Sequence, residues 1–206
     1  MRSLCSVALT LCCALAAATG CKAPTIIAPP PPGSIFDAST LPQLDLDGRP
    51  LVSGRLATVY YFAGPECPIA RSYAPEVSRL SQRDELRGIA WVMVFSEVGM
   101  TKALVQNFQR DYALAIPSLI DSSQHFACAM GAQVIPSVVV VDARGTLLYR
   151  GRIDNRYQAL GLSYGPPTER DLAAVVDAIA SGSPLAPAQT AAIGCLLSPC
   201  TTFAQP

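Results

Sequence analysis

Three almost uninterrupted apolar runs constrain the fold of this chain more than any other feature. They read LATVYYF at residues 56–62, IAWVMVF at 89–95 and SVVVVD at 137–142. β-Branched and aromatic residues dominate these runs, and none of them alternates strictly between apolar and polar positions. Such runs are typical of strands that are buried on both faces. The chain must therefore provide helices to cover both faces of a sheet.

Segments with helical periodicity lie between these runs. Residues 69–82 place Ala70, Tyr73, Ala74, Val77 and Leu80 on one face, and Pro75 is expected to kink this helix. Further helices are predicted at 101–111, at 124–130 and from Thr168 to Gly182, and short strands at 118–121 and 146–150. The order predicts an α/β fold with a central mixed β-sheet flanked by helices on both faces.

Composition excludes two classes of protein. Half of the 206 residues are hydrophobic and 15% are charged, which is incompatible with a disordered chain. Fifteen basic and fifteen acidic side chains cancel, so there is no positive excess to neutralise phosphates. We therefore expect one globular core and no nucleic-acid partner.

The N-terminus predicts export and a lipid anchor. A short basic start precedes an uncharged apolar stretch at 4–18, and the sequence Ala18-Thr19-Gly20-Cys21 resembles a bacterial lipobox. Residues 1–20 are then a lipoprotein-type signal peptide, and Cys21 carries the lipid. Lys22, a residue other than Asp, favours the outer membrane, with the protein facing the periplasm. The usual Leu three residues before the Cys is here Ala18, and the alternative is cleavage after Ala18 with secretion to the periplasm.

Three further segments follow the signal peptide. Residues 21–35 contain four consecutive prolines and predict an extended spacer, or else a disordered tail. Residues 36–185 form the predicted domain. Residues 186–206 form a C-terminal tail that contains Cys195 and Cys200.

Four cysteines remain in the predicted domain and tail, in a compartment where disulfides persist. Cys195 and Cys200 could close a structural disulfide, or Cys195 could pair with Cys67, and the sequence does not choose between these pairings. Cys128 lies in an apolar helix and is expected in the core. His125 precedes it at helical spacing, but two ligands do not make a metal site, and His125 is expected on an exposed helix surface. No cofactor and no metal are expected.

Cys67 is the strongest candidate for reactivity. It follows a buried strand and precedes a helix that begins near Pro68, where the positive end of the helix dipole stabilises a thiolate. Pro136 lies immediately before the SVVVVD strand. The flanking Pro65, Glu66 and Pro68 are poorly suited to a core strand, which argues against a purely structural role for Cys67.

This arrangement resembles the thioredoxin-like superfamily, in which a Cys at a strand-to-helix junction faces a cis-Pro loop. The chain is most similar to its bacterial redoxin-domain proteins. The resemblance rests on ECPIARSYAPE at 66–76, GAQVIPSVVVVDARG at 131–145, YRGRIDNRY at 149–157, PTERDL at 167–172 and IGC at 193–195. It implies a thioredoxin-like fold over most of the predicted mature chain.

The chain departs from three patterns of this superfamily. Disulfide-exchanging members have Cys-x-x-Cys, but Ala70 occupies the second position here. Peroxiredoxins have Pro and Thr where this chain has Tyr60 and Gly64, so the hydroxyl that orients a peroxide is missing. Copper-carrying relatives have a second Cys where this chain has Ala63.

The resulting expectation is a lipid-anchored, extracytoplasmic oxidoreductase in which Cys67 is the nucleophile for thiol–disulfide exchange. Cys195 is the candidate resolving thiol, Pro136 the loop proline, and Arg152 part of a basic segment that could close over the thiolate. Its partners would be a disulfide or peroxide substrate, a thiol reductant that the sequence does not identify, and the membrane. The alternatives are a thiol peroxidase and a non-catalytic thioredoxin-fold binding module of the envelope.

Overall fold

The structure is a computed structural model of the chain, and it describes residues 25–51, 55–163 and 165–202. The predicted signal peptide and Cys21 lie outside the described residues.

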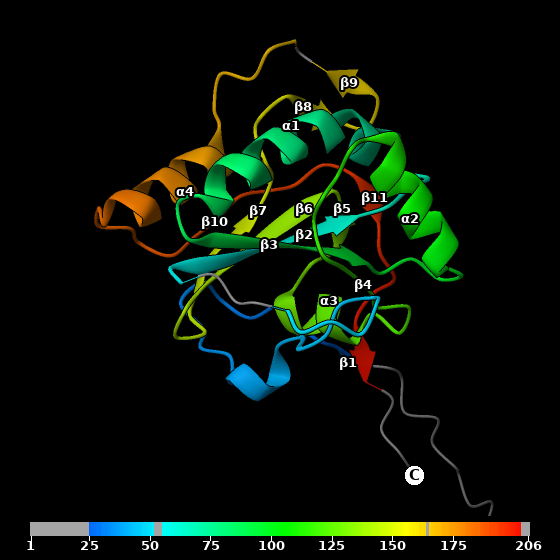
Figure 1. The fold of residues 1–206 in the computed structure, drawn as a ribbon, viewed down its shortest axis with the longest axis horizontal. Coiled ribbons are helices and arrows are strands. Elements are labelled where there is room, and N and C mark those ends of the chain that lie inside the picture. Colours follow the sequence, from blue (N-terminus) through cyan, green and yellow to red (C-terminus); the bar gives the residue numbers. More distant parts are fainter. Residues whose placement is uncertain (1–24, 52–54, 164, 203–206) are drawn as a thin grey trace, which may run out of the picture.

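Six strands form the central sheet in the order β10-β7-β6-β2-β3-β4 (Figure 1). Their bounds are β2 Ala57–Ala63, β3 Ile89–Phe95, β4 Ser118–Ile120, β6 Ser137–Asp142, β7 Leu147–Gly151 and β10 Ala188–Gln189. The pairs β2–β3, β3–β4 and β7–β10 are parallel, whereas β6 runs antiparallel to both β2 and β7. The sheet is therefore mixed, as predicted, and the three apolar runs form its centre.

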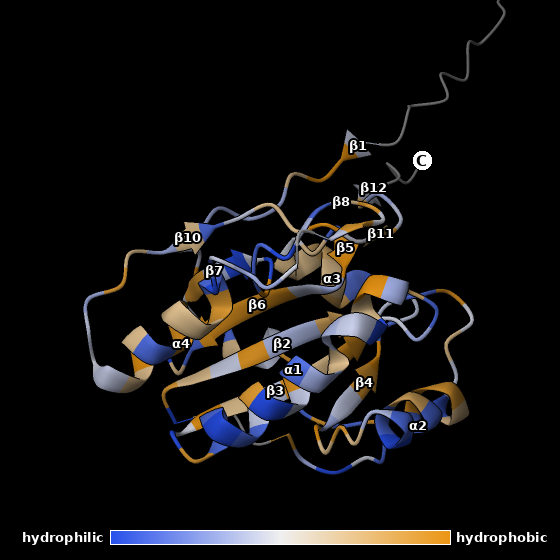
Figure 2. Ribbon diagram, turned by 90° about the horizontal axis from the view of Figure 1, so that it is seen from above, coloured by the Kyte–Doolittle hydropathy of each residue, from blue (hydrophilic) through white to orange (hydrophobic). Residues whose placement is uncertain are grey.

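Helices cover both faces of this sheet. Helices α1 (Pro68–Glu85) and α4 (Asp171–Ser181) lie over one face, and α3 (His125–Met130) lies on the other (Figure 1). Helix α2 (Lys102–Asp111) lies beside the β4 edge, and a short 3-10 helix, η1, spans Ala38–Thr40. The orange segments of β2, β3 and β6 in Figure 2 fit their position between these layers. The predicted α/β, thioredoxin-like fold class is confirmed.

The start of α2 and the end of α4 follow local capping chemistry, and the start of α4 does not. The Thr101 side chain caps α2 by accepting a hydrogen bond from the N–H of Leu104, and Gly182 ends α4 with a positive φ of 67°. Helix α4 begins later than predicted, because its N-cap is Arg170 and not Thr168. Thr168 is instead bonded to Asn155. Helix α1 continues through Pro75 to Glu85.

The proline-rich segment does not form a free spacer from residue 25 onward. Strand β1 (Thr25–Ile26) pairs with β12 (Thr201–Thr202), so the two ends of the described chain meet. The N–H of Gly33 donates to the carbonyl of Leu147, and the N–H of Phe36 donates to the carbonyl of Gly145. Prolines remove donors from this segment, but Gly33 and Phe36 retain theirs and bond to the β6–β7 hairpin. The spacer interpretation is wrong for residues 25–35.

The predicted tail is likewise part of the domain. Strand β10 joins the central sheet, β11 (Cys195–Leu196) pairs antiparallel with β5 (Val134–Ile135), and β12 meets β1. A separate small ribbon consists of β8 (Tyr157–Ala159) and β9 (Leu162–Ser163). None of the helices in the described part of the chain is long and apolar enough to cross a membrane.

Candidate redox site

Cys67 lies where β2 ends and α1 begins. It is the N-cap residue of α1, with Pro68 in the first helical turn, as the sequence predicted. Its N–H donates to the carbonyl of Gly64 at 3.1 Å, which closes the turn between strand and helix. The thiol does not cap the helix, and the residue is only 1% exposed. Cys67 is therefore held at a helix N-terminus but covered from solvent.

The cis-proline loop supplies the first contact of the Cys67 thiol. The peptide bond between Ile135 and Pro136 is cis, so the feature implied by the family resemblance is present. The Cys67 Sγ donates to the carbonyl of Ile135 at 3.2 Å. This contact joins residues 68 positions apart in sequence and places the thiol against the end of β5.

Cys195 supplies the second contact. Strand β11 pairs with β5 so that Cys195 faces Ile135, and the two sulfur atoms of Cys195 and Cys67 lie 2.7 Å apart. Both thiols are free. A disulfide bond is about 2.05 Å long, so a movement of roughly 0.7 Å would join them. The two cysteines are separated by 128 residues in sequence, and only the folding back of the tail brings them together.

Gly194 makes this close approach possible. A β-carbon at position 194 would overlap the carbonyl group of Ile135 and would lie 3.0 Å from the nitrogen of Pro136. The backbone before Cys195 therefore lies directly on the cis-proline loop. This contact explains the glycine in Ile193-Gly194-Cys195, because any side chain at position 194 would push Cys195 away from Cys67.

Electrostatics disfavour ionisation of Cys195. Burial raises the pKa of the Cys195 thiol to about 12, and the hydrogen bond to Cys67 and the electrostatic effects of the nearby Cys67 and Glu97 side chains act in the same direction. Burial also raises the pKa of Glu97, and the nearby Glu66 carboxylate raises it further. The Cys195 thiol therefore needs a base to become a nucleophile, and the nearby Glu97 carboxylate is a stronger base than an ordinary glutamate.

The Glu97 side chain fills the space that the missing hydroxyl would need. A β-carbon at Gly64 would overlap the Oε2 atom of Glu97 and the Cδ1 atom of Ile135. Gly64 is the position at which peroxiredoxins carry Thr, and no Thr side chain fits here without displacing these groups. The Oε2 atom of Glu97 is buried and has no hydrogen-bond partner within the described structure.

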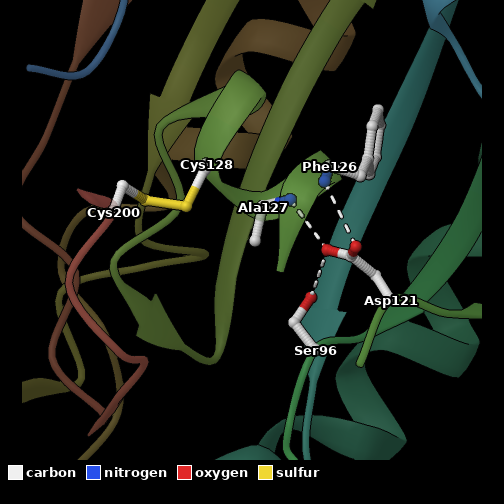
Figure 3. The surroundings of a disulfide bond; sticks show 6 residues. All are labelled: Ser96, Asp121, Phe126, Ala127, Cys128 and Cys200. Carbon is white, nitrogen blue, oxygen red and sulfur yellow. Dashed lines mark hydrogen bonds between the residues drawn. A yellow bond between two sulfur atoms is a disulfide. The ribbon is translucent and has the colours of Figure 1, made fainter. Parts of the chain in front are cut away.

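The second cysteine pair corrects a prediction. Cys200 forms a disulfide with Cys128, and not with Cys195, across 72 residues of sequence (Figure 3). Cys128 is therefore a half-buried disulfide partner and not a reduced core residue. Because the tail folds back onto the domain, Cys195 lies at the cis-proline loop and Cys200 lies beside α3. A local Cys195–Cys200 bond would require these two residues to meet, and the structure directs them to different partners.

The helix that anchors Cys200 is itself fixed to the sheet. Asp121 accepts hydrogen bonds from the N–H groups of Phe126 and Ala127 at the start of α3, and from the hydroxyl of Ser96 (Figure 3). The Phe126 ring stacks on Phe62 and meets Tyr60 edge-on. The disulfide thus ties the tail to a well-anchored point.

Comparison with known proteins agrees with this geometry. The model of the Redoxin family matches residues 23–163, which is more than half of the chain. The chain belongs to the Redoxin family. The match includes Cys67 and Pro136 and ends before Cys195, so the second thiol lies outside the matched region. Comparison with curated proteins found no sequence match.

Solved structures confirm the fold. An uncharacterised conserved protein from Geobacillus kaustophilus is 23% identical, with a TM-score of 0.67, and the alignment covers 83% of this chain and 89% of that one. A hypothetical protein from Sinorhizobium meliloti 1021 is 24% identical, with a TM-score of 0.66 and coverage of 84% and 95%. A putative thioredoxin from Neisseria meningitidis is 22% identical, with a TM-score of 0.54 and coverage of 73% and 91%.

Arg152 does not close over the thiolate of this redoxin. Its guanidinium forms ion pairs with Asp171, at 2.8 Å, and with Glu169, near the start of α4. Arg150 is buried and donates to Pro30, Met130 and Gln189, so it ties the N-terminal segment, α3 and the tail together. The structure brings Cys67, Pro136 and Cys195 together and places Arg152 among carboxylates elsewhere.

Two further side chains of the 152–157 segment pack against α1. Asp154 accepts from the hydroxyl of Tyr73 at 2.5 Å and pairs with Arg156, whose guanidinium lies over the Tyr73 ring. These contacts bind the segment to α1, and a mobile lid would have to break them.

Sequence reasoning missed Glu97. It is the second residue after the buried strand β3, in a loop where functional side chains often lie, but no spacing pattern connects it to Cys67 or Cys195. His125 is exposed, as predicted, and Cys128 is held in the disulfide. Among the described residues no group of three or more potential metal ligands occurs.

Proposed function

We propose that this redoxin is a thiol–disulfide oxidoreductase that uses Cys67 and Cys195 as a redox couple. The observation that carries the proposal is the 2.7 Å separation of their two sulfur atoms beside the cis-Pro136 peptide. Ala70 removes the second cysteine of a local Cys-x-x-Cys motif, and Cys195 supplies a thiol from the tail in its place.

The reaction balances with these two thiols alone. The Cys67 thiolate attacks a substrate disulfide, one substrate sulfur leaves as a thiolate, and Cys67 remains in a mixed disulfide. The Cys195 thiolate then attacks Cys67 Sγ, which releases the second substrate sulfur and forms the Cys67–Cys195 disulfide. The substrate gains two electrons and two protons, which the two protein thiols lose. An external dithiol reductant must restore the starting state.

The proposal includes the compartment. The pattern of residues 1–21 supports export and lipid attachment at Cys21, and the Cys128–Cys200 disulfide fits an oxidising environment. A Cys21→Ala variant is expected to leave the membrane fraction. Unchanged membrane association of this variant would contradict the lipid anchor and would leave the redox proposal standing.

The test of the redox couple uses the full mature chain and one molar equivalent of 4,4′-dithiodipyridine, an uncharged disulfide. The unaltered protein is expected to release two thiopyridones per chain and to end with a Cys67–Cys195 disulfide in peptide mass spectra. Cys195→Ser is expected to release one thiopyridone and to keep a mixed disulfide on Cys67. A Cys195→Ser variant that still releases two would overturn the proposal.

Peroxide reduction is the competing activity. Cys67 could be oxidised by peroxide to a sulfenic acid, which Cys195 would resolve to the same disulfide. Gly64 argues against it, because glycine supplies no hydroxyl to orient a peroxide and the Glu97 carboxyl group occupies the space beside it. Oxidation of Cys67 by hydrogen peroxide that is faster than its reaction with the aromatic disulfide would favour the peroxidase.

A further inference from the structure

We propose that Glu97 is the proton acceptor that activates Cys195 for the resolving step. This inference rests on the proposed redox couple and adds a residue that neither the family match nor the sequence pattern assigns.

The geometry places the Glu97 carboxyl group in the same buried corner as the two sulfurs. Its Oε2 atom lies over Gly64, whose carbonyl accepts the N–H of Cys67, and beside the Ile135 side chain. Ile135 is also the residue that pairs with Cys195 and whose carbonyl accepts the Cys67 thiol. Glu97, Cys67 and Cys195 thus share the neighbour Ile135, and Gly64 additionally lies between Glu97 and Cys67.

The Oε2 atom of Glu97 is also an unused acceptor. It is buried and makes no hydrogen bond to any described residue, which costs free energy in the folded protein. Buried polar atoms without a partner are rare, so this atom is a candidate functional group. In the resting pair Cys195 donates its proton toward Cys67. That acceptor is lost once Cys67 is bonded to a substrate sulfur, and Glu97 then offers a free oxygen on the same side.

The charges near the two sulfur atoms favour transfer of the Cys195 proton to Glu97 over loss of that proton to solvent. The ionisable groups that face one another are Glu66, Cys67, Glu97 and Cys195. A Cys195 thiolate next to an ionised Glu97 would place two negative charges in a partly buried site, which is why Glu97 raises the pKa of Cys195. Transfer of the proton to Glu97 keeps a single negative charge there. The raised pKa of Glu97 makes it a stronger base for this transfer.

The proton balance of the resolving step is complete. Glu97 takes the proton of the Cys195 thiol, and the resulting thiolate attacks Cys67 Sγ and displaces the substrate thiolate. Glu97 then returns the proton to the departing substrate sulfur. Glu97 ends as the carboxylate, and no additional co-reactant is required.

The experiment follows the two releases of thiopyridone by stopped flow across pH. The first phase reports attack by Cys67, and the second, which is independent of probe concentration, reports resolution by Cys195. In the unaltered protein the rate of the second phase is expected to rise with pH and then to level off once the Glu97 carboxyl group is ionised. Glu97→Gln is expected to slow it roughly 100-fold near neutral pH. It is also expected to replace the plateau with a rise of about tenfold per pH unit, as direct thiol ionisation requires.

Two variants serve as matched controls. Glu97→Asp keeps a carboxyl group and is expected to restore the plateau in part. Glu66→Gln removes one neighbouring charge but not the acceptor, so the plateau is expected to stay and its midpoint to move to lower pH, since Glu66 raises the Glu97 pKa.

The outcomes separate this inference from the redox couple itself. A Glu97→Gln variant with the second phase and pH profile of the unaltered protein would overturn the role of Glu97 and leave the couple intact. Equal slowing of both phases would also overturn it, because that result indicates a change in packing. If the unaltered protein and Cys195→Ser both lack the second phase, the couple fails and the role of Glu97 fails with it.

Discussion

Removal of the Cys128–Cys200 disulfide should uncouple the tail from the redox site. The double variant Cys128→Ser/Cys200→Ser is the cleanest perturbation, because neither partner of the broken bond is left as a free thiol. The bond closes a loop with a sequence separation of 72 residues. The chain-entropy relation gives a stabilisation of about 4.4 kcal/mol for a loop of that length. The global free energy of unfolding is expected to fall by an amount of that order.

The local effect on Cys195 follows from what else holds β11 in place. Strand β11 has a two-residue ladder with β5, and the N–H of Leu197 donates to the carbonyl of Gln133. These backbone bonds contribute about 1 kcal/mol each, and burial of Leu197 adds about 2 kcal/mol. Ordering residues 194–197 costs about 4–8 kcal/mol. Without the tether the docked and undocked tails are therefore close in free energy.

The disulfide shifts this balance by fixing the far end of the segment. The near end is held where the N–H of Thr190 donates to the carbonyl of Arg150. We expect the double variant to slow the resolving phase about tenfold and to let the mixed disulfide on Cys67 accumulate. The assay is the second release of thiopyridone, with urea unfolding measured in parallel.

The two measurements together can refute this reasoning. A variant that loses several kcal/mol of stability but resolves within about twofold of the unaltered rate would show that β11 docks without its tether. Either single variant, Cys128→Ser or Cys200→Ser, opens the same bond. The effects on resolution should then be alike and should not add in the double variant.

Three further predictions concern individual side chains. Gly194→Ala should cost about 1–3 kcal/mol in tail docking, because the added methyl group overlaps the Ile135 carbonyl, and the yield of the internal disulfide measured by mass spectrometry should fall. Arg152→Ala should lower stability by about 1 kcal/mol or less and leave the first thiopyridone phase unchanged, because Arg152 pairs with Asp171 at the start of α4; a tenfold slower phase would restore the lid hypothesis. Glu97→Gln should be more stable than the unaltered protein near neutral pH. The folded pKa of Glu97 is raised above its ordinary value of 4.5, so the unaltered protein loses stability relative to this variant as pH rises through the folded pKa. The difference between the urea midpoints of Glu97→Gln and the unaltered protein should therefore be larger at about pH 7.5 than at about pH 4. The same difference at both pH values would contradict this sign.

Local chemistry predicted most of the elements correctly. The apolar runs became β2, β3 and β6, and Cys67 and Pro68 began α1 as their residue types require. The family resemblance anticipated the cis peptide bond at Pro136. Local rules failed at Thr168, where a bond to Asn155 displaced the start of α4. They also failed at residues 25–35. The sequence shows that the prolines there have no N–H group to donate, but it does not show which strand accepts hydrogen bonds from the N–H groups that remain.

The sequence by itself determined the alternation of strands and helices, the position of Cys67 at a helix N-terminus and the absence of a local second thiol. These features depend on hydrophobic periodicity and on neighbouring residues, which can be read along the chain. The tertiary structure decided that Cys195 lies next to Cys67, that Cys128 forms a disulfide with Cys200, and that Glu97 lies beside Gly64 and Ile135, near the two free thiols. Each of these depends on contacts between segments that are distant in sequence. Four cysteines allow three complete pairings, and only the path of the folded tail selects one of them.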